Sequence, residues 1–473
     1  MQARENRKES NMSKAERDFD VIVVGGGGAG LAAATVAASE GAHMLLVDAD
    51  KKLGGSTSLS TGVFYAAGTS VQKKLGIEDN PADQFRYYMN VNQHKLEPSV
   101  VHRLCHDSGP TLEWLLSLGV EFKTQDLYCS GVDGIPRGHM AAGHGASIAE
   151  ALEGSFTGKK VDVVLNTRVQ QLLVEGAGDN KAVTGIVTED GPFRAGAVVI
   201  STGGFGNNRR MLAELYPDAA RQGDAAWYIG SKHSRGDGLN MGRAAGADIA
   251  GYNRGLLLLT TGFVQELESH LPGWLVYINR EGRRFVDEYT EYSVLAEVLR
   301  EQLAGECFGI FDEATRATAK APNCPNWTPD RLDHFIKTKQ IKSAPTLAEL
   351  ADLVGIRAET LATTIENYNA DCDAGHDSWF FKEKKWLQAV RKPPFYAAPI
   401  RPQVVCWTGT GLRIDREARV LNRADRHIKG LFGAGEATGG MFGECYAAGG
   451  ASIGNAVTFG RVAGRNAALF ASR

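Results

Sequence analysis

The sequence predicts an α/β protein in which one domain is split along the chain by a second, inserted domain. Three observations support this prediction. A strand, a glycine-rich turn, a helix and a second strand follow one another near the start, which is the order of a βαβ unit. Buried strands that end in glycines return after Val198 and after Leu431. The region between residues 251 and 392 has fewer glycines and reads as mainly helical.

Length and composition exclude several classes of protein. The 473 residues suffice for two or three domains. A net charge of −3 without a long block of one sign argues against a nucleic-acid partner or an acidic membrane surface. No apolar run approaches the roughly 20 residues that span a membrane. The 7 cysteines form no CxxC pair, which argues against disulfide or iron–sulfur scaffolds and favours a reducing cytoplasm.

The chain is expected to divide into four segments, with Pro393-Pro394 marking one junction. The polar first segment has no apolar stretch, so a disordered tail is expected rather than a secretory signal. The segments are residues 1–18 (tail), 19–250 (first part of the split domain), 251–394 (inserted α+β cap domain) and 395–473 (second part of the split domain).

Gly25, Gly27 and Gly30 follow the first strand with the spacing GxGxxG. The first glycine allows a tight turn, the second lets the backbone approach a pyrophosphate, and the third lets the helix pack against the strand. The helix N-terminus adds N–H donors and a positive dipole end. Asp48 ends the second strand, where an acid accepts bonds from ribose hydroxyls. A glycine-rich turn without a ligand leaves this order unexplained, so the sequence predicts a Rossmann-like, dinucleotide-binding domain.

Further glycine segments favour FAD over NAD as the dinucleotide. The loop Gly54–Thr57 follows the second strand, and strand-to-glycine patterns recur around Gly203, Gly409 and Gly435. A long, bent FAD needs several such close approaches of backbone. Glu436 is a candidate acceptor for the ribityl hydroxyls, and the alternative is a solvated loop acid.

The same segments look like the fumarate reductase/succinate dehydrogenase flavoprotein superfamily, which includes the 3-ketosteroid dehydrogenases. The resemblance covers nearly the whole chain from Phe19 and implies a Rossmann-like FAD-binding domain with an inserted cap. Some members attach FAD through a histidine near the loop at Gly54. No histidine lies between Gly54 and Gly68, so the resemblance implies non-covalent FAD. The segments that carry it are Asp20–Leu31, Gly54–Thr57, Ser201–Phe205, Gly236–Gly238 and Gly430–Glu436.

The motifs and the resemblance together give one set of predicted cofactor-binding residues. Ser452 is also expected to cap the C-terminal helix. The set is Gly25, Gly27, Gly28, Ala29, Gly30, Asp48, Gly54, Gly55, Ser56, Thr57, Val169, Thr202, Gly203, Gly204, Asp237, Glu436, Ser452 and Ile453.

Two tyrosines distinguish this sequence within the superfamily. Tyr292 follows the stretch Asn279–Glu288, at the place where fumarate reductases carry a proton-donating arginine. Tyr446 lies near the place of an arginine that clamps a substrate carboxylate. Two carboxylates need cationic partners, so tyrosines at both places argue against a dicarboxylate. This pattern looks like the 3-ketosteroid dehydrogenases and related cyclic-ketone desaturases.

The resemblance implies a role for each site residue. The Tyr446 hydroxyl and the Gly450 amide would bind the ketone oxygen, Tyr292 would remove the α-proton, and flavin N5 would accept a hydride. A free tyrosine has a pKa near ~10 and needs help to act as a base. Tyr128 is the candidate helper, with a packed surface aromatic as its alternative. Tyr289 competes with Tyr292 for the role of base.

The leading hypothesis is therefore an FAD-dependent desaturase of a cyclic ketone, either a 3-ketosteroid or a smaller cyclohexanone, with an external electron acceptor or donor. The same site run in reverse would be an enone reductase. One alternative is a fumarate reductase-like enzyme that reduces an unsaturated acid. Another is a non-catalytic flavin subunit.

Two further patterns were weighed and set aside. Residues 450–454 fit GxSxG, but no clear strand precedes them and no histidine follows them, so a hydrolase is not expected. No metal site is expected either, because His102, Cys105 and His106 lack further ligands.

Overall fold

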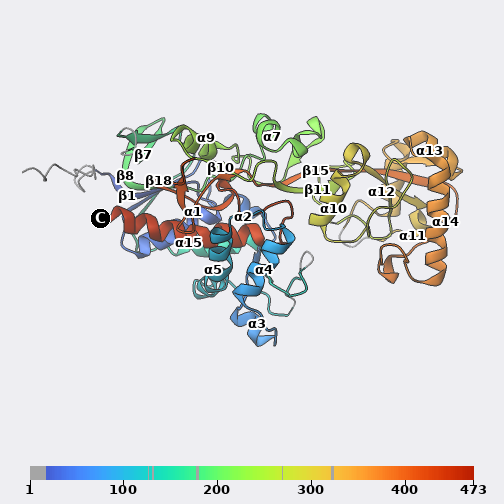
Figure 1. Ribbon diagram of the computed structural model, residues 1–473, viewed down its shortest axis with the longest axis horizontal. Coiled ribbons are helices and arrows are strands. Elements are labelled where there is room, and N and C mark those ends of the chain that lie inside the picture. The colour runs from blue at the N-terminus through green and yellow to red at the C-terminus, as the bar shows by residue number, and fades with distance from the viewer. Residues whose placement is uncertain (1–16, 126, 130–132, 177–180, 269, 321–323) are drawn as a thin grey trace, which may run out of the picture. The chain divides into compact units, whose positions relative to one another are not determined.

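The computed structural model describes residues 17–125, 127–129, 133–176, 181–268, 270–320 and 324–473 (Figure 1). Most of the expected tail lies outside the described residues. The chain forms two compact units. The first unit comprises Met1–Tyr216, Gly230–Gly255 and Trp407–Arg473, and the second comprises Pro217–Ile229 and Leu256–Cys406.

The second unit differs at its edges from the expected insert of residues 251–394. It includes residues 217–229 and extends to Cys406. The reason is a single long strand, β15 (Phe395–Thr408), which begins after Pro394 and pairs with β13 (Cys307–Asp312). The short β9 (Trp227–Tyr228) pairs with the same strand.

The first unit is built on an eight-stranded sheet with the order β17-β18-β7-β8-β1-β2-β5, with β6 on β7. The central β1 pairs in parallel with β2 and with β8, and α1 connects β1 to β2. This is the expected βαβ unit, and the predicted α/β class with a split domain is confirmed. The strands are β1 (Phe19–Val24), β2 (Met44–Val47), β5 (Val161–Val164), β6 (Gln171–Glu175), β7 (Ala182–Thr188), β8 (Gly191–Ile200), β17 (Arg419–Leu421) and β18 (His427–Gly433).

The C-terminal helix α15 (Ala451–Ala471) lies beside α1 (Gly28–Ser39), as Figure 1 shows for the red and blue helices. The two backbones approach so closely that a Cβ on Gly460 would lie 2.3 Å from the carbonyl oxygen of Ala29. A Cβ on Gly464 would lie 2.2 Å from the oxygen of Ala33. The C-terminal helix α15 therefore belongs to the same unit as the N-terminal βαβ segment.

The rest of the first unit consists of further helices and two small strand pairs. The region from Pro81 to Leu118 forms two helices. The remaining helices are α2 (Gly55–Leu59), α3 (Ser70–Lys74), α4 (Pro81–Val91), α5 (Pro98–Ser117), α6 (His144–Gly154), α7 (Arg209–Leu215) and α9 (Asp237–Ala244), and the small strand pairs are β3 (Val63–Tyr65) with β4 (Gly138–Met140) and β10 (Ile249–Ala250) with β16 (Gly411–Leu412).

The second unit is an α+β structure around a six-stranded sheet, in which β11-β15-β13-β12 are neighbours and β14 and β9 pair with β15. Its core packs Val276, Ile310 and Ala397 of the sheet against Leu361 and Ile365 of a helix. The other elements are α8 (Pro217–Ala220), β11 (Gly255–Thr260), β12 (Val276–Ile278), α10 (Tyr292–Arg300), α11 (Glu313–Thr318), α12 (Pro329–Lys337), β14 (Lys342–Ala344), α13 (Leu347–Val354) and α14 (Ala358–Ala374).

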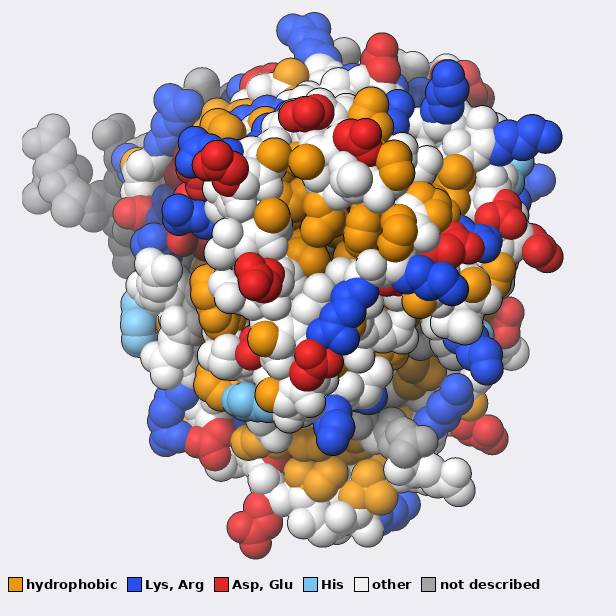
Figure 2. Space-filling view, turned by 90° about the vertical axis from the view of Figure 1, so that its right-hand side faces the viewer, with side chains coloured by type: hydrophobic (Ala, Val, Ile, Leu, Met, Phe, Trp, Pro, Cys, Tyr) orange, Lys and Arg blue, Asp and Glu red, His pale blue; other side chains and the backbone are white. Residues whose placement is uncertain are grey.

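Some apolar side chains remain exposed. Figure 2 shows one face of the molecule, on which hydrophobic side chains gather in a patch framed by charged ones. The second unit exposes Leu353, Trp379 and Phe381. Among the residues that the structure describes, no helix combines the length and apolar character needed to cross a membrane.

Candidate functional site

The glycine-rich turn has the geometry that each of its glycines was expected to provide. Gly25 has a φ of +99°, which strongly favours glycine. A Cβ on Gly30 would lie 1.8 Å from the oxygen of Gly25, so this position is closed by packing. A Cβ on Gly27 would meet nothing within 4 Å. The turn therefore packs tightly at its ends and is open at Gly27, which precedes the first residue of α1.

Asp48 holds this turn by its carboxylate. Gly26 N–H donates to one oxygen at 2.5 Å, and Asp50 N–H donates to the other at 2.7 Å. Burial raises the pKa of Asp48, and these two amide bonds oppose that rise. Because it is fixed at the end of β2 beside the turn, Asp48 has the placement expected of a ribose-binding acid.

The loop Gly54–Thr57 reaches the same turn. Gly54 forms a parallel bridge with Gly27, and Gly28 N–H donates to Thr57 Oγ1 at 3.2 Å. Ser56 Oγ accepts from Ser231 N–H at 2.9 Å. Predicted cofactor residues from two segments of the first unit are thus joined by direct contacts.

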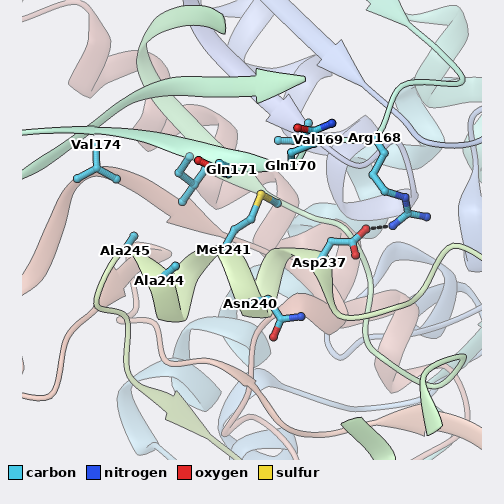
Figure 3. Close-up of a pocket in the computed structure, with 11 residues that line it drawn as sticks. Arg168, Val169, Gln170, Gln171, Val174, Asp237, Asn240, Met241, Ala244 and Ala245 are labelled. Carbon is cyan, nitrogen blue, oxygen red and sulfur yellow. Dashed lines mark hydrogen bonds and ion pairs between the residues drawn. The ribbon is translucent and has the colours of Figure 1, made fainter. Parts of the chain in front are cut away.

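Val169 and Asp237 line one pocket of about 440 Å³ between the loop before β6 and helix α9. Figure 3 shows Arg168 pointing toward Asp237, with which it forms an ion pair. Asn240 and Met241 of α9 line the same pocket. Asp237 therefore sits at the edge of this pocket with its charge partly neutralised.

Glu436 is fixed and is not a freely solvated loop acid. Its Oε1 accepts hydrogen bonds from the backbone N–H of Thr408 at 2.9 Å and from the Thr408 hydroxyl at 2.8 Å. A Cβ on Gly204 would lie 2.4 Å from Glu436 Oε1 and 2.0 Å from Thr408 Oγ1. Thr202 Oγ1 accepts from the N–H of Gly238 at 3.2 Å.

These features fit an extended dinucleotide. The open backbone at Gly27, the carboxylates of Asp48 and Glu436, and the glycine cradle at Gly203 and Gly204 all belong to the first unit. Ala29 and Ile453 are buried nearby in α1 and in the first turn of α15. The residues present would hold FAD along this path.

Tyr446 is tied to the start of α15. Its side chain is 5% exposed, its hydroxyl donates to Ser452 Oγ at 2.8 Å, and the same oxygen accepts from Ser452 N–H at 2.9 Å. The expectation that Ser452 caps this helix is wrong, because the N-cap is Gly450, which has no side chain. The Tyr446 hydroxyl instead takes up one of the N–H groups that a helix start leaves free.

Gly450 cannot be replaced without strain. Its φ is +93°, and a Cβ there would lie 2.7 Å from a methyl carbon of Val63 and 2.8 Å from the Val63 oxygen. Its own carbonyl oxygen accepts from Tyr65 N–H at 3.3 Å. Strand β3 therefore holds Gly450 in place at the N-terminal start of α15.

Two aromatic rings pack against the ring of Tyr446. The ring centroid of Phe442 lies 5.4 Å from that of Tyr446, and the centroid of Trp407 lies 6.0 Å away. Trp407 Nε1 is buried and has no hydrogen-bond partner among the described residues. A buried N–H without a partner is costly and points to an acceptor supplied from outside the chain.

A buried ion network supports the β3 side of the site. Arg137 forms ion pairs with Asp79 at 2.7 Å and with Asp133 at 2.6 Å, and the Tyr65 hydroxyl donates to Asp133. Tyr128, the candidate helper tyrosine, exchanges two backbone hydrogen bonds with Gly138, at 2.8 and 2.9 Å. Its proposed role stays a prediction.

In the second unit, Tyr292 is the first residue of α10 and is half-buried. The ring of His270 lies 5.6 Å from the ring of Tyr292, edge to face, and 5.6 Å from the ring of Tyr289. Tyr289 also packs against Trp386 at 4.5 Å. The two competing tyrosines thus belong to one aromatic cluster.

The second unit also contains a buried network of charges. Arg284 donates to both oxygens of Glu288, at 2.8 and 2.9 Å, and to both oxygens of Asp377, at 3.0 and 2.8 Å. Lys382 lies 3.2 Å from Glu288. Burial raises the pKa of Glu288, but Lys382 and Arg284 more than offset it, so the net pKa is lowered.

Sequence reasoning missed several of these residues. Trp407, Phe442 and His270 are brought to the two tyrosines by folding, and no motif or periodic pattern marks them. His102 and His106 do stack, at 4.1 Å, but no group of three or more His, Cys, Asp or Glu side chains among the described residues could hold a metal ion.

Comparisons with known proteins agree with this geometry. Residues 20–453 match the FAD binding domain family. Fumarate reductase (cytochrome) of Shewanella frigidimarina is 29% identical, over 98% of this chain and 80% of that protein. Urocanate reductase of Eggerthella lenta is 30% identical, over 96% of this chain and 75% of that protein.

The chain is also similar to a solved structure. The crystal structure of 3-ketosteroid-Δ4-(5α)-dehydrogenase from Rhodococcus jostii RHA1, in complex with 4-androstene-3,17-dione, is 26% identical with a TM-score of 0.79. The match covers 96% of this chain and 98% of that one. The chain therefore belongs to the FAD binding domain family and is an FAD-dependent oxidoreductase of the fumarate reductase flavoprotein superfamily.

Proposed function

We propose that the protein is a dehydrogenase that introduces a C=C bond next to the carbonyl of a cyclic ketone, with 3-ketosteroids as the first substrate class. The observation that carries this proposal is the Tyr446 hydroxyl, buried at the start of α15 beside the left-handed Gly450. It is a neutral donor held in place, which suits a ketone oxygen better than a carboxylate.

The carbonyl side of the reaction needs stabilisation of negative charge. Loss of an α-proton places charge on the ketone oxygen, and fixed donors aimed at that oxygen lower the barrier. The Tyr446 oxygen accepts the N–H of Ser452 at 2.9 Å, at the positive end of the α15 dipole. The hydroxyl proton, which is directed at Ser452 Oγ, would turn to the ketone oxygen when the substrate binds, and the Gly450 N–H would be the second donor.

The surroundings of Tyr446 favour an apolar substrate. Trp407 and Phe442 present rings to it, and the sequence places tyrosine where fumarate reductases have a carboxylate-binding arginine. The likeness to a dehydrogenase solved with a steroid dione supports the same substrate class.

Tyr292 would remove the α-proton, because it stands where the superfamily carries its proton-transferring side chain. FAD, when bound, supplies the acceptor for the hydride that leaves the β-carbon. The Tyr446 and Gly450 donors would hold the carbonyl so that the proton and the hydride leave from neighbouring carbons.

A second candidate function is the reduction of an activated C=C bond in an enone or an unsaturated acid. It is favoured by the fumarate reductase and urocanate reductase relatives, which match almost the whole chain. This reading needs a cation to replace the missing carboxylate clamp.

An anaerobic flavin assay tests the two functions. The purified protein receives a saturated 3-ketosteroid, a 4-en-3-one, a cyclohexanone or succinate in separate cuvettes, and the oxidised flavin absorbance is followed. Bleaching by a ketone that is lost in Tyr446→Phe but kept in Tyr252→Phe supports the desaturase. Tyr252 is 60% exposed and serves as the matched control. If succinate alone bleaches the flavin, or if reduced flavin is reoxidised by fumarate and not by enones, the ketone proposal is wrong.

A further inference from the structure

The second unit contains a cluster of four half-buried aromatic side chains, His270, Tyr289, Tyr292 and Trp386, called here the cap cluster. The cluster is closely built. A Cβ on Gly273 would lie 2.5 Å from the Trp386 ring and 2.8 Å from the Tyr289 ring, so only glycine lets the chain after His270 pass there. His270 is thereby placed in contact with both tyrosine rings.

We propose that His270 is the proton partner of Tyr292, accepting the phenol proton while the phenol oxygen takes the α-proton of the ketone. This inference rests on the proposed function and names the group that makes a tyrosine effective as a base. His270 acts through Tyr292, so it is a positioning and proton-accepting residue rather than one that touches the substrate.

The state of His270 suits this role. Its backbone oxygen accepts from the Cys324 thiol at 2.6 Å, and its ring contacts Tyr289 and Tyr292. Burial lowers the pKa of His270, so the imidazole is neutral at neutral pH and has a nitrogen lone pair to offer. Among the described residues no hydrogen bond, and so none from the Tyr292 hydroxyl, occupies its ring nitrogens, and the bond between that hydroxyl and the imidazole would form when the ketone binds.

The other titratable groups near His270 do not take over this role. Glu268, two residues earlier, is bound to Asn326 and to the Trp327 indole N–H, and burial raises its pKa. Cys324 directs its thiol at a backbone carbonyl, and burial raises its pKa to about 12. His270 is the neutral acceptor in contact with the Tyr292 ring.

The proton balance closes with the flavin as oxidant. The α-carbon C–H bond breaks and its proton moves to the Tyr292 oxygen, while the Tyr292 O–H bond breaks and its proton moves to a His270 nitrogen. The electron pair of the α-carbon C–H bond would form the new C=C bond, and FAD, when bound, would supply the acceptor for the hydride that leaves the β-carbon. The imidazolium then releases its proton to water, which a half-buried side chain permits.

The test measures the pH dependence of ketone-driven flavin reduction in the holoenzyme. In wild type, the rate should fall as pH drops through the lowered pKa of His270, because protonation removes the acceptor. His270→Gln should lower kcat by about 100-fold, leave KM nearly unchanged and abolish this acid limb. Added imidazole should restore part of the rate in His270→Ala. His334→Gln, an exposed histidine of the same unit, should behave as wild type.

Two results separate this inference from the proposed function. If Tyr292→Phe oxidises the ketone at the wild-type rate, the role of Tyr292 fails, and that of His270 fails with it. If Tyr292→Phe is inactive but His270→Gln keeps its rate, or keeps its pH profile and His270→Ala gains nothing from imidazole, only the role of His270 is overturned.

Discussion

The start of α15 in the first unit and the start of α10 in the second each present a tyrosine, but they hold it in different ways. Tyr446 is 5% exposed and exchanges two hydrogen bonds with Ser452. Tyr292 is half-buried, and its ring packs edge to face with the ring of His270. One tyrosine is fixed by the backbone of a helix, and the other belongs to an aromatic cluster open to solvent.

On the proposed function, this difference follows from the two tasks. A donor to a developing enolate works best when it is already oriented, so rigidity at Tyr446 lowers the barrier. A base must return its proton to water after each turnover, so full burial at Tyr292 would trap the proton. Substitutions in the contacts that hold each region measure how far its tyrosine depends on them.

The largest effect is expected from the buried charge network of the second unit. Arg284→Met leaves Glu288 and Asp377, both 0% exposed, without their main partner. Removing one member of such a network costs about 3–5 kcal/mol of folding stability. Chemical denaturation should show this loss in Arg284→Met and almost none in Arg283→Met, because Arg283 is exposed. Equal stability of the two variants would mean that the network does not support the second unit.

A smaller effect is expected at the N-cap of α15. Gly450→Ala places a Cβ at a φ of +93° and within 2.9 Å of Val63, which costs about 1–3 kcal/mol of strain. Relief of this strain would move the Gly450 N–H away from the ketone oxygen. The melting temperature should therefore fall slightly, while ketone-driven flavin reduction should fall strongly. Gly246→Ala has open space around its Cβ, although its φ is +98°, and serves as a control for the backbone strain alone.

Much of the fold could be predicted because its signals are local. The strand, the GxGxxG turn and the first helix lie together in the chain, and the structure forms them as β1, the turn and α1. The edge of the insert could not be placed, because β15 runs past Pro394 and its partners, β13 and β9, are distant in sequence. A proline pair marks a turn, but it does not tell which sheet the next strand joins.

The site was predictable to a similar degree. Tyr446 and Gly450 lie four residues apart, so one motif carries both. His270 has no such neighbour, since only the folded chain brings its ring to Tyr289 and Tyr292. The sequence places Ser452 at the start of the right helix but predicts the wrong contact for it. A serine near a helix start suggests an N-cap. Nothing in the sequence shows that the Tyr446 hydroxyl accepts the hydrogen bond from the Ser452 N–H.

The smallest effect is expected from Ser452→Ala, which tests how the first region holds its tyrosine. The variant removes the hydroxyl that accepts from Tyr446 but keeps the backbone N–H bond. One lost hydrogen bond costs about 1 kcal/mol, so kcat/KM for the ketone should fall roughly fivefold. Ser472→Ala, exposed at the far end of α15, should leave it unchanged.

Ser452 is also a predicted cofactor-binding residue, so the flavin content of the Ser452→Ala variant must be measured beside its rate. A fivefold loss at full FAD occupancy means that Ser452 acts through Tyr446 and that the helix N–H does most of the holding. A loss that follows the flavin content instead places the hydroxyl with the cofactor. A loss as large as that of Tyr446→Phe would mean that the orientation of Tyr446 depends on this one hydroxyl. The first region would then be no more rigid than the second, and its contrast with the cap cluster would disappear.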